Sequence, residues 1–164
     1  MLAISHAEPG DVGDLADLME ELDRFYGVTE IGPRIERESQ IRRVLFGVRP
    51  AAYTLLARDG EELVGMAAYS FLWPAAGVTT SLFLKELYVR QNRQRHGVGR
   101  RLIEVLCEVA AAQGCSRVEW QTEVDNAAAQ AFYKALGAPV LSGKVFYRLD
   151  ETELTRLAHG GQKP

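Results

Sequence analysis

The sequence predicts an α/β fold of the α+β kind, with a central mixed sheet of seven strands flanked by helices. Asp59-Gly60 joins two apolar runs, a pattern typical of a tight β-hairpin. The stretch from Leu84 to Gly114 passes from strand-forming residues through a glycine-containing turn into a long amphipathic helix. Because a further strand follows this helix, the unit is expected to form a right-handed parallel crossover.

The size and composition fit one globular domain. The chain has 164 residues, of which 47% are hydrophobic, and this is enough for a substantial core. No apolar run approaches the ~20 residues of a membrane span, and the first five residues lack the features of a secretory signal. We therefore expect a single domain over residues 1–159, a disordered tail over residues 160–164, and a cytoplasmic protein.

The N-terminal half is expected to supply an edge strand, two helices and an antiparallel meander. Asp11 is expected to cap a first helix, whose apolar stripe contains Val12, Leu15, Leu18, Met19, Leu22 and Phe25. A second helix has few apolar positions, which suits a segment lying over a substrate cleft. The expected strands cover residues 2–5, 52–58, 63–71 and 79–89, and the second helix covers residues 34–46 after a loop at 28–32.

The C-terminal half is expected to alternate strands with helices. A helix from Val98 is expected to end at Gly114, and a strand is expected over residues 116–122. Asp125 or Asn126 should cap the next helix, which should end at Gly137. The last strands are expected at Val140 and over residues 145–149, followed by a short helix that begins at a capping-box sequence over residues 150–153.

The turn between Gln94 and Gly99 has the features of an anion site. The first N–H groups of a helix lack partners inside it, and the helix dipole adds partial positive charge there. Glycines allow a ligand to approach the main chain closely. The chain has a net charge of −3, yet five arginines gather here: Arg90, Arg93, Arg95, Arg100 and Arg101. A local basic cluster on a mildly acidic chain favours a small anionic ligand over nucleic acid.

The motif Gln94-x-x-Gly97-x-Gly99 resembles the acetyl-CoA pyrophosphate motif of the GCN5-related N-acetyltransferases (GNAT). Neither the nucleoside-triphosphate P-loop pattern nor the dinucleotide pattern of three glycines is present at this turn. The resemblance covers nearly the whole chain and is most specific over residues 84–137. It implies the GNAT fold, in which the fourth and fifth strands splay apart and acetyl-CoA lies in the gap.

The resemblance also implies which residues contact acetyl-CoA. In the family, backbone groups on the fourth strand hold the pantetheine arm and the glycine-containing turn holds the pyrophosphate. The expected contacts are Leu87, Tyr88, Val89, Gln94, Arg95, His96, Gly97, Val98, Gly99, Arg100, Asn126 and Tyr133. His96 lies within the turn, so we expect its side chain beside CoA or in solvent rather than as a base. No cluster with metal-ligand spacing occurs in the sequence, and no metal is expected.

Tyr133 lies in a second stretch that resembles a family signature. The pattern is Asn126, then Phe132-Tyr133, then Gly137, and it implies that Tyr133 is the general acid that protonates the departing CoA thiolate. The matching asparagine of the family also bonds the pantetheine arm. Without the resemblance, the favoured interpretation of Tyr133 is an amphipathic core tyrosine, and Asn126 can be explained as a helix cap.

Glu86 is the candidate general base. An amine substrate is mostly protonated near neutral pH and must lose a proton before it attacks. Strand alternation predicts that Leu84, Glu86 and Tyr88 share one face. The alternative is a glutamate that is simply solvated or held in a salt bridge.

The stretches Phe71-Leu72-Trp73-Pro74 and 84–89 resemble the diamine acetyltransferase branch, which includes spermidine/spermine and thialysine acetyltransferases. Lys85-Glu86 stands where that branch usually has two acids, so a smaller amine or an amino acid fits as well as a polyamine. We expect direct transfer of an acetyl group from acetyl-CoA to a small primary amine. The alternatives are a protein or peptide amine acetyltransferase and a non-catalytic acyl-CoA-binding regulatory module.

A homodimer is expected by analogy with that branch. The predicted C-terminal strand is apolar and aromatic at Val145, Phe146 and Tyr147, and alone it would leave an adherent edge. No nucleic-acid or membrane partner is expected.

Overall fold

The computed structural model describes residues 1–160. Its contacts divide the chain into two units, one ending at Asp125 and the other beginning at Asn126, and each is considered by itself. The expectation of a single domain over residues 1–159 stays a prediction. Residues 161–164 of the predicted disordered tail lie outside the described residues.

The first unit contains a sheet whose strands follow the order β1-β2-β3-β4-β5. Pairing is antiparallel from β1 to β4 and parallel between β4 and β5, so the predicted hairpin and parallel crossover are confirmed. The strands are β1 (Leu2–His6), β2 (Tyr53–Asp59), β3 (Glu62–Leu72), β4 (Ser81–Val89) and β5 (Arg117–Trp120). The helices are α1 (Val12–Phe25), α2 (Arg34–Phe46) and α3 (Val98–Ala112), with 3-10 turns at Pro9–Asp11 and Gln91–Arg93.

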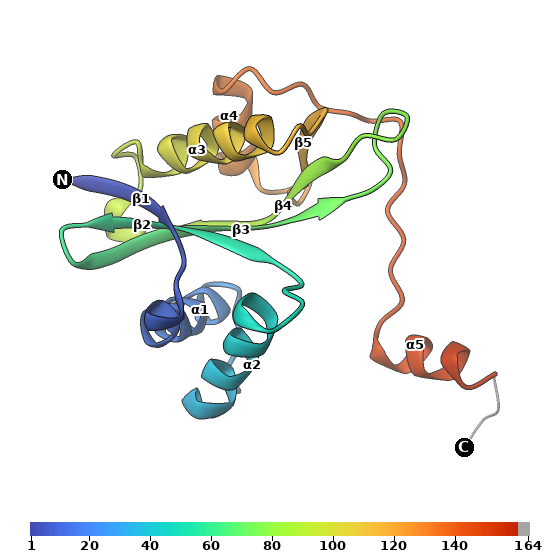
Figure 1. Ribbon diagram of the computed structural model, residues 1–164, viewed down its shortest axis with the longest axis horizontal. Coiled ribbons are helices and arrows are strands. Elements are labelled where there is room, and N and C mark those ends of the chain that lie inside the picture. Colours follow the sequence, from blue (N-terminus) through green and yellow to red (C-terminus); the bar gives the residue numbers. More distant parts are fainter. Residues whose placement is uncertain (161–164) are drawn as a thin grey trace. The chain divides into compact units, whose positions relative to one another are not determined.

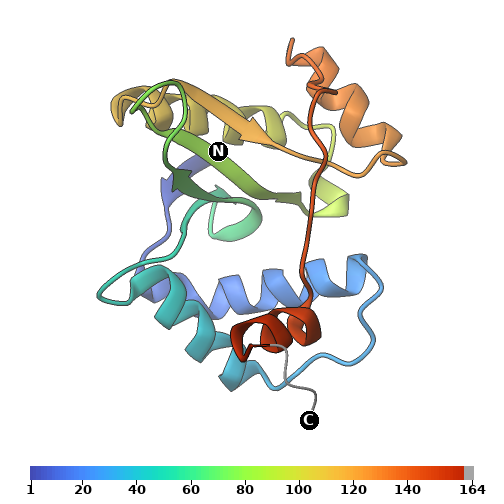
Figure 2. The same cartoon turned by 90° about the vertical axis from the view of Figure 1, so that its right-hand side faces the viewer.

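Helices cover both faces of this sheet. Figures 1 and 2 show α1 and α2 on one side and α3 on the other. The α1 side buries a cluster in which Leu15, Leu18 and Leu22 pack on Leu56 and Met66. On the opposite side, α3 buries the apolar stripe that its 3.6-residue period predicts. Residues on its buried face are Val98, Leu102, Ile103, Leu106 and Ala110.

Helix α2 is loosely packed. As predicted from its sparse apolar pattern, α2 has no fully buried residue among those described.

The expected helix cap at Asp11 takes a different role in the structure. Asp11 precedes α1, but its carboxylate accepts the N–H of Glu8 at 2.7 Å instead of capping α1 itself. The same carboxylate pairs with Arg58 at 2.8 Å, which ties the start of α1 to β2.

A β-bulge in β4 places Leu84 on the opposite face of the sheet from the predicted one. Glu86 lies opposite Ala68 on β3, whereas Leu84 lies opposite Tyr69, so Lys85 is an extra residue. Such a bulge turns the side chains before and after it to different faces. Glu86 therefore shares the α1 side with Tyr88, while Leu84 is buried on the α3 side. Strict alternation could not anticipate this, because it assumes an unbroken ladder.

Strands β4 and β5 pair over only part of their length. The ladder ends at Leu84–Trp120, although β4 continues to Val89. Among the described residues, the β5-facing edge of residues 85–89 therefore has no strand partner. This open edge is the splay that the GNAT resemblance implies.

The second unit corrects the predicted strand count. It contains α4 (Ala127–Ala135) and α5 (Glu151–Ala158), and its described residues form no strand. Val140 and residues 145–149 were expected to be strands, but they lack ladder partners, and Val145 and Tyr147 are 76% and 87% exposed. Their composition suits a pleated surface, but a strand also needs a neighbour with free backbone groups. The described sheet therefore has five strands, and the prediction of seven was wrong.

No helix within residues 1–160 is long and apolar enough to cross a membrane. The cytoplasmic location stays a prediction.

Candidate active site

The turn before α3 has the backbone geometry of an anion site. Gly97 is the N-cap of α3 and has a left-handed φ of 82°, while Arg95 has a φ of 64°. The first intrahelical bond joins the N–H of Arg101 to Gly97 O at 3.0 Å, so the preceding N–H groups of the helix remain available to a ligand. An added Cβ at Gly97 would meet no atom within 4 Å, which leaves the space over the turn open. This cradle fits the pyrophosphate of acetyl-CoA.

Arg95 is the arginine of this region best placed for an anionic ligand. Arg90 and Arg93 pair with carboxylates of α1 and the β2–β3 hairpin, and Arg100 and Arg101 pair with carboxylates of their own helix. Arg95 is exposed and has no carboxylate partner among the described residues. The predicted cluster of five arginines is thus mostly a set of structural ion pairs.

Side chains within the turn hold its shape. The amide of Gln94 donates to the carbonyl of Val89 at 3.0 Å, which ties the turn to the end of β4. His96 Nδ1 lies 2.7 Å from the carbonyl of Gln94. His96 therefore lies in the turn with its ring engaged locally, and its expected position beside CoA or in solvent stays a prediction.

Gly99→Val should weaken acetyl-CoA binding while leaving the fold largely intact. Gly99 is the second residue of α3, where a helix tolerates a side chain, but a branched side chain there would crowd a pyrophosphate. Calorimetry with acetyl-CoA should show a higher Kd, with an unchanged circular dichroism spectrum. An unchanged affinity in the folded variant would show that the pyrophosphate does not bind at this turn.

Glu86 lies half-buried on the α1 side of β4, directly after the bulge. Burial raises its carboxyl pKa, although the Tyr26 hydroxyl, the Lys85 charge and the Leu87 N–H act to lower that pKa. A carboxylate with a raised pKa in a partly dehydrated setting is a stronger base than an exposed one. The neighbouring Lys85 is exposed.

Tyr26 is a residue of this site that sequence reasoning missed. Its hydroxyl donates to Glu86 Oε1 at 3.1 Å across 60 residues of sequence. It directly follows α1, where the N–H of Val28 bonds to Asp23 O at 2.9 Å and Gly27 takes a φ of 84°. This Schellman-type ending fixes the direction in which Tyr26 leaves the helix. The glycine after the apolar stripe signals the end of the helix, but nothing local connects Tyr26 to Glu86.

Tyr88 contributes its side chain to structure. Its hydroxyl donates to Glu21 at 2.9 Å, and Glu21 also pairs with Arg90 at 2.9 Å. Burial and the contact with Glu21 raise the pKa of Tyr88 to about 12. With its ring buried toward α1, Tyr88 has only backbone groups to offer a pantetheine arm.

Tyr133 and Asn126 belong to the second unit. Asn126 is the N-cap of α4, and its Oδ1 accepts the N–H of Ala129 at 3.1 Å, as the helix-cap interpretation predicts. Tyr133 follows Phe132 on the same helix, with ring centroids 5.2 Å apart. The acid role of Tyr133 and the pantetheine contact of Asn126 are taken up as proposals below.

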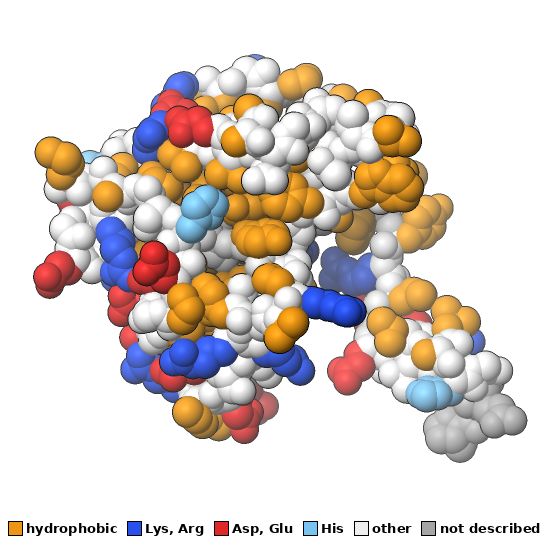
Figure 3. Space-filling view, in the orientation of Figure 1, with side chains coloured by type: hydrophobic (Ala, Val, Ile, Leu, Met, Phe, Trp, Pro, Cys, Tyr) orange, Lys and Arg blue, Asp and Glu red, His pale blue; other side chains and the backbone are white. Residues whose placement is uncertain are grey.

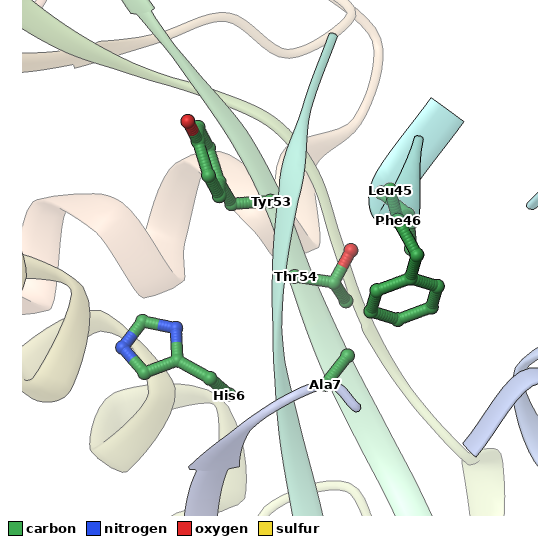
Figure 4. A pocket seen from close by; sticks show the side chains of 6 residues that line it. All are labelled: His6, Ala7, Leu45, Phe46, Tyr53 and Thr54. Carbon is green, nitrogen blue, oxygen red and sulfur yellow. The ribbon is translucent and has the colours of Figure 1, made fainter. Parts of the chain in front are cut away.

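A hollow of about 240 Å³ lies at the end of β1 and the start of β2. Figure 4 shows His6 and Tyr53 on one side of β2 and Leu45 and Phe46 on the other. The full lining comprises His6, Ala7, Leu45, Phe46, Tyr53 and Thr54. None of these was singled out as a site residue, although Leu45 and Phe46 belong to the helix that was expected to lie over a substrate cleft. Among the described residues, no group of three or more His, Cys, Asp or Glu is arranged to hold a metal ion.

The fold and the family match define the class of protein. Residues 15–138 match the acetyltransferase (GNAT) family, and the chain belongs to that family. It is an N-acetyltransferase, and acetyl-CoA is the co-substrate of such enzymes.

Particular relatives refine this assignment. The chain is 29% identical over 147 residues to thialysine N-epsilon-acetyltransferase of Bos taurus, across 85% of each protein. It is 36% identical over 116 residues to aminoglycoside N(6')-acetyltransferase type 1 of Serratia marcescens, across 69% of this chain and 79% of the relative. A solved integron cassette protein from the mobile metagenome of V. cholerae matches with a TM-score of 0.88 at 25% identity, covering 96% of this chain and 97% of that one. The predicted resemblance to the diamine branch is confirmed.

Proposed function

We propose that the enzyme transfers the acetyl group of acetyl-CoA to a primary amine of a small molecule by direct attack in a ternary complex. The half-buried Glu86 carboxylate, bonded to Tyr26, is the observation that carries this proposal. The relatives support a small acceptor, because their names specify thialysine and an aminoglycoside. The acceptor nitrogen bonds to the acetyl carbon as the carbon–sulfur bond breaks.

Two side chains move the protons in this scheme. Glu86 accepts a proton from the amine, directly or through water, so that the nitrogen lone pair becomes available. Tyr133 donates a proton to the departing thiolate, and the second proton lost by the acetylated nitrogen restores the Tyr133 hydroxyl. A backbone N–H on the open edge of β4 polarises the acetyl carbonyl. Acetyl-CoA supplies the activated thioester, with its pyrophosphate on the turn at Gly97–Gly99 and its pantetheine arm along residues 87–89 and near Asn126.

A screen of amines tests the function. Primary amines, amino acids, aminoglycosides and lysine-containing peptides are incubated with acetyl-CoA, and free thiol is measured. Thiol release with one class of small amines is the expected result. Turnover confined to peptides would favour the protein acetyltransferase, and acetyl-CoA binding without any transfer would favour the regulatory module.

Tyr26→Phe should lower kcat/KM by about tenfold on the acid side of the pH profile, because it deletes a hydrogen bond to a charged group. That bond lowers the pKa of Glu86, so its loss raises the pKa and moves the acid limb to higher pH. A pH series of kcat/KM measures this shift, with Tyr53→Phe as the control on the other face of the sheet. If both variants keep the wild-type limb, Tyr26 does not hold the base.

The enzyme is further proposed to be a homodimer. The exposed apolar segment at Val145, Phe146 and Tyr147 supports this, because a second copy could cover it. Light scattering at micromolar concentration should give twice the chain mass of 18.2 kDa. A monomer mass would exclude the dimer.

A further inference from the structure

A second hollow, of about 290 Å³, lies on the α3 side of the sheet at the C-terminal end of α3. Residues of β1, β2 and β3 line it from the sheet, and residues at the end of α3 line it from the helix. The full lining comprises His6, Tyr53, Tyr69, Phe71, Val109, Ala112 and Gln113.

This α3-side hollow is separate from both sites proposed for the acetyl transfer. Gly97, in the turn proposed for the pyrophosphate, and Val109, in the lining, are 12 residues apart. Twelve residues of α-helix span about 18 Å. Glu86 points to the α1 side and therefore lies across the sheet from the hollow. A ligand of the hollow would belong to neither acetyl-CoA nor the amine.

Three aromatic rings in mutual contact form much of the lining. Tyr53 and Tyr69 are paired on neighbouring strands, and their rings stack with centroids 5.6 Å apart. Phe71 meets both rings edge-on, at 5.7 Å from Tyr53 and 5.8 Å from Tyr69. Figure 4 shows His6 on the same side of β2 as Tyr53. Figure 3 shows hydrophobic side chains gathered on the face turned to the viewer, between the layer of α3 and the layer of α1 and α2. Such a lining favours a flat aromatic ligand.

Tyr69 brings an unused hydroxyl to this hollow. The residue is 2% exposed, and its hydroxyl has no hydrogen-bond partner among residues 1–160. Within the same part of the chain, Tyr69 Oη is not one of the unpartnered polar atoms that are closed to solvent. The small exposure that Tyr69 keeps therefore includes the hydroxyl, which opens into the hollow that the residue lines. Buried hydroxyls usually have a partner, so a ligand with an acceptor would supply what the chain does not.

The lining suits a neutral ligand. Among the described residues, no carboxylate, lysine or arginine lines the hollow. A charged ligand would lose hydration there without gaining an opposite charge. Burial, and to a smaller extent Tyr53, raises the pKa of Tyr69 to about 12, so its hydroxyl remains a donor at neutral pH.

We propose that the α3-side hollow is a second binding site, for a neutral, flat heteroaromatic molecule of two fused rings. Its rings lie against Tyr53 and Phe71, and its ring nitrogen accepts a hydrogen bond from the Tyr69 hydroxyl. The size follows from the volume, because a cavity of ~150 Å³ holds one benzene ring. The hollow of about 290 Å³ has room for a second ring.

The test uses quinoline as the ligand and naphthalene as its match in shape without the ring nitrogen. Each is titrated into the protein at saturating acetyl-CoA and followed by ¹H–¹⁵N NMR. Quinoline should shift the backbone signals of residues 109–113. Tyr69→Phe should weaken quinoline about fivefold, as expected for one lost hydrogen bond, and leave naphthalene unchanged. An absence of shifts at residues 109–113, or an equal effect of Tyr69→Phe on the two compounds, overturns the proposal.

A second variant locates the ligand. Ala112→Trp should fill the hollow and weaken quinoline at least tenfold, while acetyl transfer measured without quinoline stays at the wild-type rate. Ala111→Trp, the same enlargement at a neighbouring exposed position outside the lining, is the control and should keep wild-type affinity. Unchanged binding in Ala112→Trp, or equal losses in the two variants, contradicts the site. Because binding is measured without turnover, these results do not depend on the proposed function.

Discussion

Glu86→Gln should lower kcat by about 10²–10⁴ near neutral pH, and the loss should shrink as the pH rises. Glutamine keeps the shape of the side chain but cannot take a proton from the amine. At higher pH more of the substrate arrives already deprotonated, since a lysine-like amine has a pKa of ~10.4. The base is needed less there, so the variant approaches the wild type.

The wild-type profile carries a second signature of this carboxylate. The proposed base must be ionised to accept a proton, and burial raises the pKa of Glu86. The acid limb of wild-type kcat/KM should therefore lie at higher pH than an ordinary glutamate would give, and the Gln variant should lack that limb. A series of pH–rate profiles tests both points. A constant ratio of wild-type to variant rates at every pH would falsify the base role.

The same pKa shift provides a folding control. A carboxyl whose pKa is raised by folding binds protons more tightly in the folded state, so its contribution to stability is lost as pH rises through the raised pKa. Glutamine does not ionise, so the variant does not lose stability as the pH rises. The melting temperature of Glu86→Gln at neutral pH should therefore be no lower than that of wild type. Glu61→Gln, in the exposed β2–β3 turn, is the matched control and should keep wild-type kinetics.

Tyr133→Phe should also lower kcat by about 10²–10⁴, but without rescue at high pH. The substitution keeps the ring and its packing against Phe132, and deletes only the hydroxyl that is proposed to protonate the thiolate. Acetyl-CoA affinity, measured by calorimetry, should change little. Tyr147→Phe, which deletes a hydroxyl from an exposed side chain of the same unit, is the control. Near-wild-type turnover in Tyr133→Phe would show that the Tyr133 hydroxyl is not the general acid and that the residue has a structural role.

The two profiles together separate the two roles. The Glu86 variant should recover as pH rises, whereas the Tyr133 variant should remain depressed because its defect lies in the leaving group. If the two variants instead give parallel profiles, both far below wild type throughout, the assignment of acid and base is wrong.

Local patterns determined the helices and the cofactor turn. The period of α3 and the glycines of Gly97-Val98-Gly99 were enough to predict a long amphipathic helix that begins at a glycine-containing turn. Both features depend on residues close in sequence, because the helical repeat of side chains and the φ values that each residue allows are local properties. The same holds for α2, whose bounds match the predicted residues 34–46.

Pairing between distant residues decided the rest. The bulge at Lys85 moved Leu84 to the other face of the sheet, and the lack of ladder partners left residues 145–149 without strand structure. The hydrogen bond from Tyr26 to Glu86 joins residues 60 positions apart. Strand composition shows that a residue suits a sheet, but register and neighbours follow from which backbone groups meet in the folded chain. The sequence alone therefore determined the glycine-containing turn before α3, whereas the surroundings of Glu86 depended on the tertiary structure.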